Sequence, residues 1–449
     1  MSARAVVLAA GKGTRMKSAR PKVLHELCGR PMLWWVLEAL RASGADEIVV
    51  VTNPELDPLL DGFGVRTVVQ TEQLGTGHAV RMALDAIEPR EGCLLVAYGD
   101  MPLVDSTIFE DVQAAVDPDA GTALALVTAR MPLPSNFGRI VRSGSAVERI
   151  VEAKDCSAEQ LAIDEMNAGI YAFDEAALRA AIVQVGNANA QREYYLTDTV
   201  ELLIASGHRV APVPVADYRS VLGVNDRAEL AAARAILNAR LCEAHMLAGV
   251  TIVDPATTYL EPGLEIGRDA TLLPNTSICG ATRIGEDTTI GPNTRIADAT
   301  IGARCAIRES VVTSSRIGDE VTIGPFAHLR GNSQLASDVK IGNFVELKNA
   351  DLAEGVKANH LAYLGDTAIG PRSNIGAGTI TANFDGVRKN RTEIGADVKI
   401  GSNNTLVAPV TVGDAATTGA GAVVNRDVEP GDKVAGVPAR SIAKKPAGT

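Results

Sequence analysis

Short apolar runs alternate with amphipathic stretches over residues 1–226. Runs at 5–10, 47–52, 93–98 and 122–128 have the length and composition of buried strands, and segments such as 32–43 have a helical pattern. Strands that alternate with helices form βαβ units around a mostly parallel sheet. The pattern therefore predicts an α/β, Rossmann-like domain over residues 1–226.

One continuous helix is predicted next, over residues 226–248. The segment is rich in Ala, Leu, Arg and Glu and contains no Gly or Pro. Asp226 suits the N-cap position and Gly249 suits the stop after the last turn. We assign residues 227–249 as a linker helix between two unlike domains.

Residues 250–449 follow a period of six. Aliphatic residues recur at this spacing over 266–296, 317–347 and 394–412, and glycine often follows directly, as in Ile284-Gly285 and Ile400-Gly401. This is the pattern of a hexapeptide β-helix, in which each coil has three short strands and each strand points one aliphatic side chain inward. The pattern predicts a left-handed parallel β-helix with a basic C-terminal tail at 437–449.

The period is interrupted at 349–366 and again at 382–392. A solenoid can extrude a loop without disturbing the neighbouring coils, and extruded loops often carry function. We expect both interruptions to be extruded segments.

Composition and charge narrow the possible functions. The chain has 43 Lys and Arg against 54 Asp and Glu, a net charge of −11, which disfavours a generally basic nucleic-acid binder. Anionic substrates would need local clusters of cations. The six cysteines are scattered without a CxxC pair, which fits reduced thiols, and no stretch approaches the ~18 apolar residues of a membrane span. We expect a cytoplasmic protein without a nucleic-acid partner or membrane insertion.

A glycine-containing turn, LAAGKGTRM at 8–16, follows the first predicted strand. Glycine lets the backbone approach a phosphate, and a following helix N-terminus offers free N–H groups. The turn is neither a Walker A loop, which would need Gly in place of Val6 and a GK[ST] ending, nor the fingerprint GxGxxG, which would need Gly in place of Met16. By itself the turn is weak evidence for phosphate binding.

Other residues of this domain strengthen the case for a nucleotide. Arg15 and Lys22 suit the charge balance that phosphoryl transfer requires. The small residues of QTEQLGTGHA at 70–79 could lie beneath a nucleobase. Asp100 ends a buried strand in the sequence YGD, where α/β sheets bind ligands, and an aspartate suits Mg²⁺. Structural alternatives remain open for each: solvated charges, a turn that enters a helix, and a helix-capping aspartate.

The motifs LAAGKGTRM, PKVLH, EQLGTGHA, YGD, FGRI, VEAKD, NAGIY and GVND occur in this order. Together they closely resemble the bacterial family of bifunctional N-acetylglucosamine-1-phosphate uridylyltransferase/glucosamine-1-phosphate N-acetyltransferase enzymes. The resemblance covers nearly the whole chain and is specific, because many other sugar nucleotidyltransferases share only the first motif. It implies synthesis of UDP-N-acetylglucosamine, which feeds peptidoglycan and outer-envelope synthesis.

The resemblance implies roles for residues of the first domain. Arg15 and Lys22 would be the catalytic cations on the phosphates of UTP, and Asp100 and Asn225 would bind Mg²⁺. The sugar phosphate would attack the α-phosphorus of UTP without a protein nucleophile. Nucleotide and amino sugar would be bound by Leu8, Ala9, Ala10, Gly11, Lys22, Gln70, Gly75, Thr76, Tyr98, Gly99, Asp100, Gly138, Glu152, Asn167 and Asn225.

The β-helix half carries a second set of polar residues. His360 lies in the first interruption, close in sequence to Tyr363 and Lys348. Acetylation of a sugar amine needs a base, and histidine has a suitable pKa. Arg330 and Lys348 could bind a sugar phosphate, and Glu346 could orient the histidine.

In the same family, His360 would be the general base of acetyl transfer. The amino-sugar phosphate would contact Arg330, Lys348, Tyr363, Asn374 and Lys389, and acetyl-coenzyme A would contact Ala377, Asn383, Phe384, Ser402 and Ala420. Such β-helices pack as trimers with shared acetyl sites, so we expect a homotrimer. Phe384 replaces a usual tyrosine and Gly436 stands where relatives can carry a cation, which we expect to affect coenzyme A binding more than the chemistry.

Two other functions are consistent with parts of the sequence. In one, the nucleotidyltransferase is active and the β-helix is only a trimerisation module, which would leave the set of His360, Lys348, Arg330 and Tyr363 without a purpose. In the other, the chain is a regulatory scaffold with an inactive nucleotidyltransferase fold. Loss of Lys22 or Asp100 would indicate that case, and both are present.

Overall fold

The structure, a computed structural model, describes residues 3–442 and separates into two compact units, Met1–Leu237 and Asn238–Thr449. The end of the predicted basic tail, residues 443–449, lies outside the described residues.

A nine-stranded sheet of order β11-β7-β10-β6-β1-β4-β5 forms the centre of the first unit; off this path, β8 pairs with β10 and β9 pairs with β8. Only β10 runs antiparallel to its neighbours along this path, so the predicted mostly parallel sheet is confirmed. The four predicted runs correspond to β1, β4, β6 and β7. The strands are β1 (Ala3–Leu8), β4 (Ala45–Thr52), β5 (Arg66–Val69), β6 (Cys93–Tyr98), β7 (Thr122–Arg130), β8 (Arg139–Ser143), β9 (Ala146–Val151), β10 (Glu165–Asp174) and β11 (Arg209–Pro214). A separate short hairpin joins β2 (Glu26–Leu27) to β3 (Arg30–Pro31).

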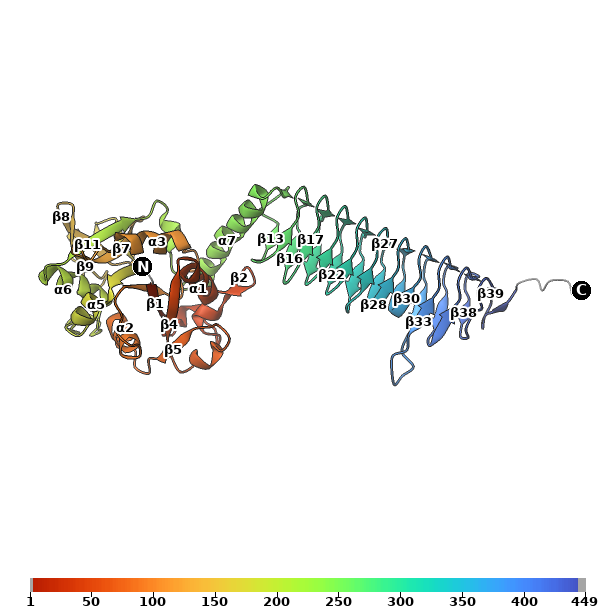
Figure 1. Cartoon of the computed structure of the whole chain (residues 1–449), viewed down its shortest axis with the longest axis horizontal. Coiled ribbons are helices and arrows are strands. Elements are labelled where there is room, and N and C mark those ends of the chain that lie inside the picture. The colour runs from red at the N-terminus through yellow and green to blue at the C-terminus, as the bar shows by residue number, and fades with distance from the viewer. Residues whose placement is uncertain (1–2, 443–449) are drawn as a thin grey trace, which may run out of the picture. The chain divides into compact units, whose positions relative to one another are not determined.

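Helices cover both faces of this sheet, which explains why its strands read as continuous apolar runs. Ala5 and Val7 of β1 pack in one core with helices α1 and α3, whereas Val6 and Leu8 pack in the other with α2, α5 and α6. The helices are α1 (Met32–Ala42), α2 (Thr76–Asp85), α3 (Ser106–Ala115), α4 (Ala158–Leu161), α5 (Glu175–Ile182) and α6 (Thr199–Ala205) (Figure 1). The carboxyl ends of β1 and β6 are adjacent, because Leu8 pairs with Tyr98.

The long predicted helix is α7 (Arg227–Leu247), and the boundary between the units falls inside it. Its first half packs Leu230 and Leu237 into a core of the first unit. In its second half, the Asn238 amide donates to the Thr258 carbonyl at 2.8 Å and accepts from the Leu260 amide at 3.1 Å. The helix thereby satisfies backbone groups of the first coil of the second unit.

The second unit is the predicted left-handed parallel β-helix, with three faces of stacked short strands (Figure 1). The first face holds β12 (Thr251–Ile252), β15 (Thr271–Leu272), β18 (Thr289–Ile290), β21 (Ala306–Ile307), β24 (Thr322–Ile323), β27 (Lys340–Asn343), β29 (Lys357–His360), β31 (Asn374–Ile375), β34 (Lys399–Ile400), β37 (Thr417–Thr418), β39 (Lys433–Ala435) and β40 (Arg440–Ser441). The second holds β13 (Tyr259–Leu260), β16 (Ser277–Cys279), β19 (Arg295–Ala297), β22 (Val311–Thr313), β25 (His328–Arg330), β28 (Glu346–Leu352), β30 (Tyr363–Ile369), β32 (Ile380–Ala382), β35 (Thr405–Val407) and β38 (Val423–Val424). The third holds β14 (Glu265–Ile266), β17 (Arg283–Ile284), β20 (Thr300–Ile301), β23 (Arg316–Ile317), β26 (Gln334–Leu335), the ends of β28 and β30, β33 (Thr392–Ile394) and β36 (Val410–Val412).

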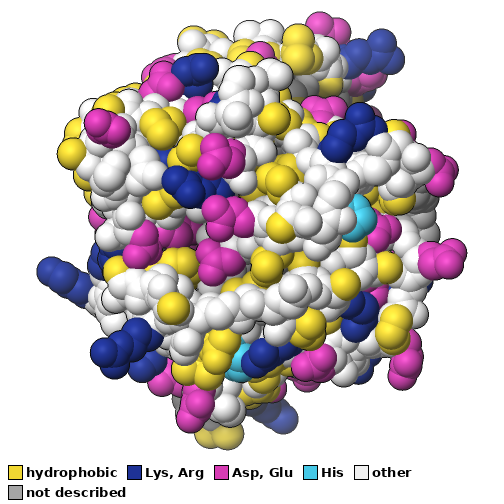
Figure 2. Space-filling model, turned by 90° about the vertical axis from the view of Figure 1, so that its left-hand side faces the viewer, with side chains coloured by type: hydrophobic (Ala, Val, Ile, Leu, Met, Phe, Trp, Pro, Cys, Tyr) yellow, Lys and Arg dark blue, Asp and Glu magenta, His cyan; other side chains and the backbone are white. Residues whose placement is uncertain are grey.

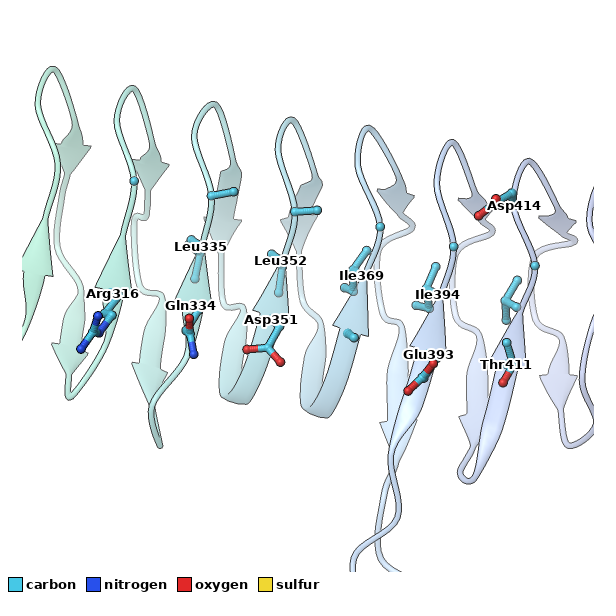
Figure 3. Close-up of a pocket in the computed structure, with 18 of the residues that line it drawn as sticks. Arg316, Gln334, Leu335, Asp351, Leu352, Ile369, Glu393, Ile394, Thr411 and Asp414 are labelled. Carbon is cyan, nitrogen blue, oxygen red and sulfur yellow. The ribbon is translucent and has the colours of Figure 1, made fainter.

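Aliphatic side chains at the repeat positions stack from coil to coil. On the third face, Leu335, Leu352, Ile369 and Ile394 lie in one column, while Asp351 and Glu393, the neighbours of Leu352 and Ile394, project in another direction (Figure 3). Each buried aliphatic residue depends on the coils above and below it for its packing. A groove of about 1040 Å³ runs along this face.

The two interruptions of the repeat have different structures. Residues 382–392 form an extruded loop between β32 and β33, as predicted (Figure 1). The prediction for 349–366 was wrong, because β28, β29 and β30 continue the coils in register. The spacing is lost there for a simple reason: Leu352 follows Leu347 after only five residues, and the small Ala358 takes the strand position that Ile341 has one coil earlier.

The last coil ends differently from the others. Strand β39 pairs with β40 in the antiparallel direction, with Val434 opposite Ser441 and Ala435 opposite Arg440. The final edge of the first face is therefore occupied by the chain's own C-terminal segment.

Figure 2 shows acidic and basic side chains interspersed with hydrophobic ones over one face of the molecule. No helix in residues 3–442 combines the length and the apolar character that crossing a membrane requires. Positive charge that could attract an anion must therefore be sought in local clusters.

Candidate functional site

A cavity of about 210 Å³ opens at the carboxyl ends of β1 and β6 in the first unit. It collects most of the predicted nucleotide residues: Leu8, Ala9, Ala10, Gly11, Lys22, Gln70, Gly75, Thr76, Tyr98 and Asp100. Four further residues that were not predicted from the sequence also line it: Val23, Gln73, Ala79 and Glu193. Gln73 and Ala79 lie inside a motif that had been noted, whereas no sequence pattern pointed to Glu193. Gly99 lies just beneath the cavity, where its amide donates to the Leu8 carbonyl at 3.0 Å.

Gly75 is required by the shape of one wall of this cavity. Its φ of +111° is a conformation that residues with a Cβ rarely adopt, and a Cβ there would lie 2.5 Å from the Tyr194 carbonyl oxygen. The next helix, α2, begins at Thr76, whose hydroxyl accepts a hydrogen bond from the Leu196 amide at 3.0 Å. The wall is thus held against the segment around Tyr194.

Lys22 joins the two predicted metal ligands. Its ammonium donates to the Asp100 carboxylate and, at 3.1 Å, to the Asn225 side-chain oxygen. The side chains of Lys22 and Asp100 are only 13% and 19% exposed, so this contact is shielded from water. Oxygens from separate segments therefore converge on a single cationic group, which is the donor set that a hard cation requires.

Mg²⁺ commonly binds through one or two protein oxygens and completes its shell with water and substrate phosphates. Asp100 and Asn225 fit that habit, and residues 3–442 contain no group of three or more His, Cys, Asp or Glu that could hold a metal by themselves. The two residues fit a magnesium ion that is shared with a phosphate ligand.

Arg15 lies apart from the nucleotide cavity. It is exposed and lines a neighbouring cavity of about 470 Å³ together with Phe137 and Asn225. Asn225 connects the two spaces, because its side chain contacts Lys22. The two predicted catalytic cations are therefore on different sides of the Asp100–Asn225 pair.

The predicted sugar residues form their own group beside β8, β9 and β10. The backbone N–H of Asn167 donates to the Gly138 carbonyl at 2.9 Å, and Glu152 accepts from the Thr197 hydroxyl at 3.2 Å. A Cβ on Gly138 would lie 3.5 Å from Glu152, so all three predicted residues are close together. Burial raises the pKa of Glu152, as expected for a carboxylate enclosed near other acids.

Tyr98 lines the nucleotide cavity, and its ring packs against Gly169, two residues beyond Asn167. Burial raises the pKa of its hydroxyl, and the carboxylates of Glu152 and Asp100 add to the effect. The phenol is therefore a neutral hydrogen-bonding group at physiological pH.

The second unit brings cations together on its second face. Arg330 and Lys348 occupy equivalent positions on neighbouring strands β25 and β28, and Arg330 Nε donates to Glu346 Oε1 at 2.9 Å. Lys389 reaches the same place from the extruded loop, where the adjacent Lys348 ammonium lowers the pKa of Lys389. Two ammonium groups side by side repel one another unless an anion lies between them. This is the electrostatic arrangement of an anion-binding site.

His360 ends β29, three residues before Tyr363 begins β30, the strand that pairs with β28 of Lys348. Its Nδ1 lies 2.8 Å from Asn343 Oδ1, one coil earlier on β27. With the Asn343 oxygen in this orientation, Nδ1 carries the proton and Nε2 has the lone pair that a general base requires.

The expectation that Glu346 orients His360 was wrong. Glu346 is engaged by Arg330, and Asn343 is the partner of the histidine. The sequence held the relevant signal, since Asn343 precedes His360 by 17 residues, which is one local coil.

The other predicted acetyl-site residues occupy three places. Tyr363 lies at the register of Glu346. The side-chain amide of Asn383 donates to Asp366 at 2.5 Å. Phe384 and Lys389 form an antiparallel backbone bridge within the extruded loop. Ala377, Ser402 and Ala420 follow β31, β34 and β37 at one corner, one per coil. Asn374 projects from the first face at the register of Lys357 and Lys399. None of these residues lines the groove of the third face.

Comparisons with known proteins agree with this two-part organisation. The MobA-like NTP transferase domain family matches residues 5–168, and bacterial transferase hexapeptide repeats match residues 263–298, 314–349 and 391–426. The chain is 45% identical to a bifunctional protein GlmU of Streptomyces avermitilis, covering 95% of this chain and 90% of that protein. It is 46% identical to that of Trichlorobacter lovleyi, over 95% and 94%, and 44% identical to that of Halalkalibacterium halodurans, over 98% and 97%.

Asp198, next to the Glu152 partner Thr197, should make stability depend on pH. Burial raises the pKa of Asp198 from 3.8 to about 6, with contributions from Glu201 and Asp155. The folded chain therefore holds this proton more tightly than the unfolded chain, so the contribution of Asp198 to stability falls as pH rises from about 4 to 6. We expect Asp198→Asn to raise the melting temperature relative to the parent at pH 8 and to lose this advantage at pH 4.5.

The control for this experiment is Asp119→Asn, which removes one charge from an exposed turn. Thermal melts at both pH values measure the difference. Equal effects of the two substitutions at pH 8 would contradict the assignment of the raised pKa to Asp198.

Proposed function

The chain belongs to the family of bifunctional GlmU proteins, and from this we propose that it acetylates glucosamine-1-phosphate and then uridylylates the product. Acetyl-coenzyme A would be the acetyl donor in the β-helix, and UTP the nucleotide donor in the first unit, with release of pyrophosphate. The observation that carries the proposal is the presence of two separate clusters. One is the cavity with Lys22, Asp100 and Asn225, and the other is His360 beside Lys348 and Lys389.

In the first unit, the protein's task is to position the reactants and stabilise charge. We propose that Asp100 and Asn225 hold Mg²⁺, which when bound would neutralise phosphate charge. Lys22 would stabilise the triphosphate from within the cavity, and Arg15 would act from the neighbouring space. Glu152 and Asn167 would orient the sugar so that its phosphate oxygen forms a bond to the α-phosphorus as pyrophosphate leaves.

In the second unit, His360 would act as the base. Arg330, Lys348 and Lys389 would hold the sugar phosphate, and Nε2 of His360 would take a proton from the sugar amine as its nitrogen attacks the acetyl carbonyl. A C–N bond forms, the C–S bond of acetyl-coenzyme A breaks, and the proton passes to the departing thiolate. Asn343 would keep Nδ1 protonated and so keep Nε2 available.

We also propose that the chain acts as a homotrimer in the cytoplasm. Asn374 lies on a different face from Arg330 and Lys348, which supports an acetyl site completed by a second copy. The proposed substrates are cytoplasmic metabolites, and none of the six cysteines, all of which lie within residues 3–442, is in a disulfide. The product, UDP-N-acetylglucosamine, would supply cell-envelope synthesis.

The two activities should be separable by substitution. With glucosamine-1-phosphate, acetyl-coenzyme A, UTP and Mg²⁺, we expect release of both free thiol and pyrophosphate. His360→Ala should lower thiol release by about 10²–10⁴-fold, the usual contribution of a general base, and leave pyrophosphate release from ready-made N-acetylglucosamine-1-phosphate intact. Asp100→Ala should lower pyrophosphate release and leave thiol release intact.

His360→Asn serves as the matched variant, because it retains a polar side chain but has no basic nitrogen. Thiol release by wild type that His360→Asn does not reduce would reject the base assignment. No thiol release by wild type, with pyrophosphate formed only from the acetylated sugar, would mean that the β-helix is a trimerisation module. Absence of both products would favour the non-enzymatic scaffold.

Removal of divalent metal should affect only one activity. Excess EDTA is expected to abolish pyrophosphate release, because the oxygen ligands of Asp100 and Asn225 carry no positive charge and only the cation that they hold can neutralise the triphosphate there. Added Mg²⁺ should restore the activity. Thiol release measured in the same tube should persist. Pyrophosphate release that resists EDTA would reject the magnesium assignment.

The trimer should form through the corner next to His360. Phe326 and Phe344 stack there with ring centroids 5.3 Å apart, and both are 55% exposed. Both have positive φ, an unfavourable conformation for bulky residues, at a corner where other coils place Asn275, Asn293 or Asn403. In sedimentation, the wild-type protein should have the mass of three chains. The double variant Phe326→Ser/Phe344→Ser should have the mass of one chain. A wild-type protein that sediments as one chain would contradict the proposal.

A further inference from the structure

Gln70 has its side-chain amide fixed at the edge of the nucleotide cavity. The residue is 4% exposed and lines the cavity. Its Nε2 atom lies 2.9 Å from Nδ1 of His78 and 3.4 Å from the carbonyl oxygen of Gly75. His78 is not among the cavity-lining residues, so it contacts Gln70 from behind.

The two contacts determine which atom of the Gln70 side-chain amide is the nitrogen Nε2 and which is the oxygen Oε1. The Gly75 carbonyl oxygen can only accept, so the Gln70 atom that faces it must be the nitrogen. The same nitrogen faces His78, whose Nδ1 must then accept the second amide hydrogen. Both hydrogens of Nε2 are thereby used, and no described residue donates to Oε1. The group that Gln70 has left for a ligand is an acceptor.

His78 is held in the state that this arrangement needs. An acceptor Nδ1 requires a neutral ring with its proton on Nε2. Burial lowers the pKa of His78, the positive charge of Arg81 lowers it further, and Glu72 acts in the opposite direction. The ring lies against Tyr194, with centroids 6.4 Å apart, and Gly77 beside it donates to the Tyr194 carbonyl at 2.7 Å.

We propose that His78 is a positioning residue that fixes Gln70 with Oε1 toward the base and so selects uracil over cytosine. Uracil offers an N–H donor at N3, which Oε1 can accept. Cytosine has a lone pair at N3, and the two acceptors would repel. Without His78, the amide can rotate and present its N–H groups, which cytosine N3 accepts. This inference rests on the proposed uridylyltransferase function and adds the group that sets its base preference.

The test compares two substitutions of His78: one removes the hydrogen-bond acceptor, and the other provides a different acceptor. His78→Phe keeps the ring packing against Tyr194, and His78→Asn can place an amide oxygen near the position of Nδ1. The ratio of kcat/KM for UTP to that for CTP is measured by pyrophosphate release with N-acetylglucosamine-1-phosphate. We expect His78→Phe to lower this ratio at least about tenfold, the size of one oriented hydrogen bond, and His78→Asn to keep it near the wild-type value.

Controls separate an effect on base selection from general damage. His208→Phe makes the same replacement elsewhere in the first unit and should leave the ratio unchanged. Thiol release in the second unit and the melting temperature report whether each variant is folded, and His78→Leu replaces His78→Phe if the latter does not fold. An unchanged ratio in the apolar variant would overturn the proposal. So would an equal loss in the apolar variant and His78→Asn, because the acceptor would then be irrelevant.

Failure of the proposed function is recognised separately, as wild-type protein that releases no pyrophosphate from UTP. Calorimetric titration of UTP and CTP into wild type, His78→Phe and His78→Asn then gives the same ratio from binding alone. A preference for UTP that His78→Phe loses and His78→Asn keeps supports the role of His78, and any other pattern rejects it.

Discussion

Parallel pairing in strict register places residues that are far apart in sequence at the same height, and both units depend on it. In the first unit, it aligns Leu8 with Tyr98, so that the glycine-containing turn and Asp100 border one cavity. In the second, it aligns Asn343 with His360 and Arg330 with Lys348. A slip of one residue on any of these strands would turn the side chain to the opposite face. The register of the strands therefore decides which side chains come together in each candidate site.

The sequence was most informative where the backbone imposes a period. Buried parallel strands require apolar runs and coils require an aliphatic residue every sixth position, so both folds could be predicted. It was least informative where a period shortens, as between Leu347 and Leu352, because a five-residue step shifts every later position. That shift concealed the strands around His360 and led to Glu346, rather than Asn343, as the expected partner.

The nucleotide cavity shows the same contrast at the level of single residues. Its motifs identified most of the lining, since glycine and small residues are needed wherever the backbone approaches a ligand. Glu193 could not be found in this way, because it reaches the cavity through tertiary packing of the segment beside Gly75. The direction in which the Gln70 amide points depends on the Gly75 carbonyl, and a side-chain orientation leaves no trace in a one-dimensional pattern. The net charge of −11 likewise gives no sign of the local pairing of Lys348 with Lys389, which only the family resemblance placed at one site.

The covered ends of the β-helix have a further consequence. A stack of parallel coils exposes unpaired backbone groups at both ends, and such edges are templates on which another chain can add. Here Asn238 of α7 bonds to the first coil and β40 turns back antiparallel to β39 at the last. Strand β40 is only two residues long, and so short an edge strand is a poor template for a further coil. The solenoid thus has a fixed length, and a fold that resembles one layer of a fibril is prevented from elongating into one.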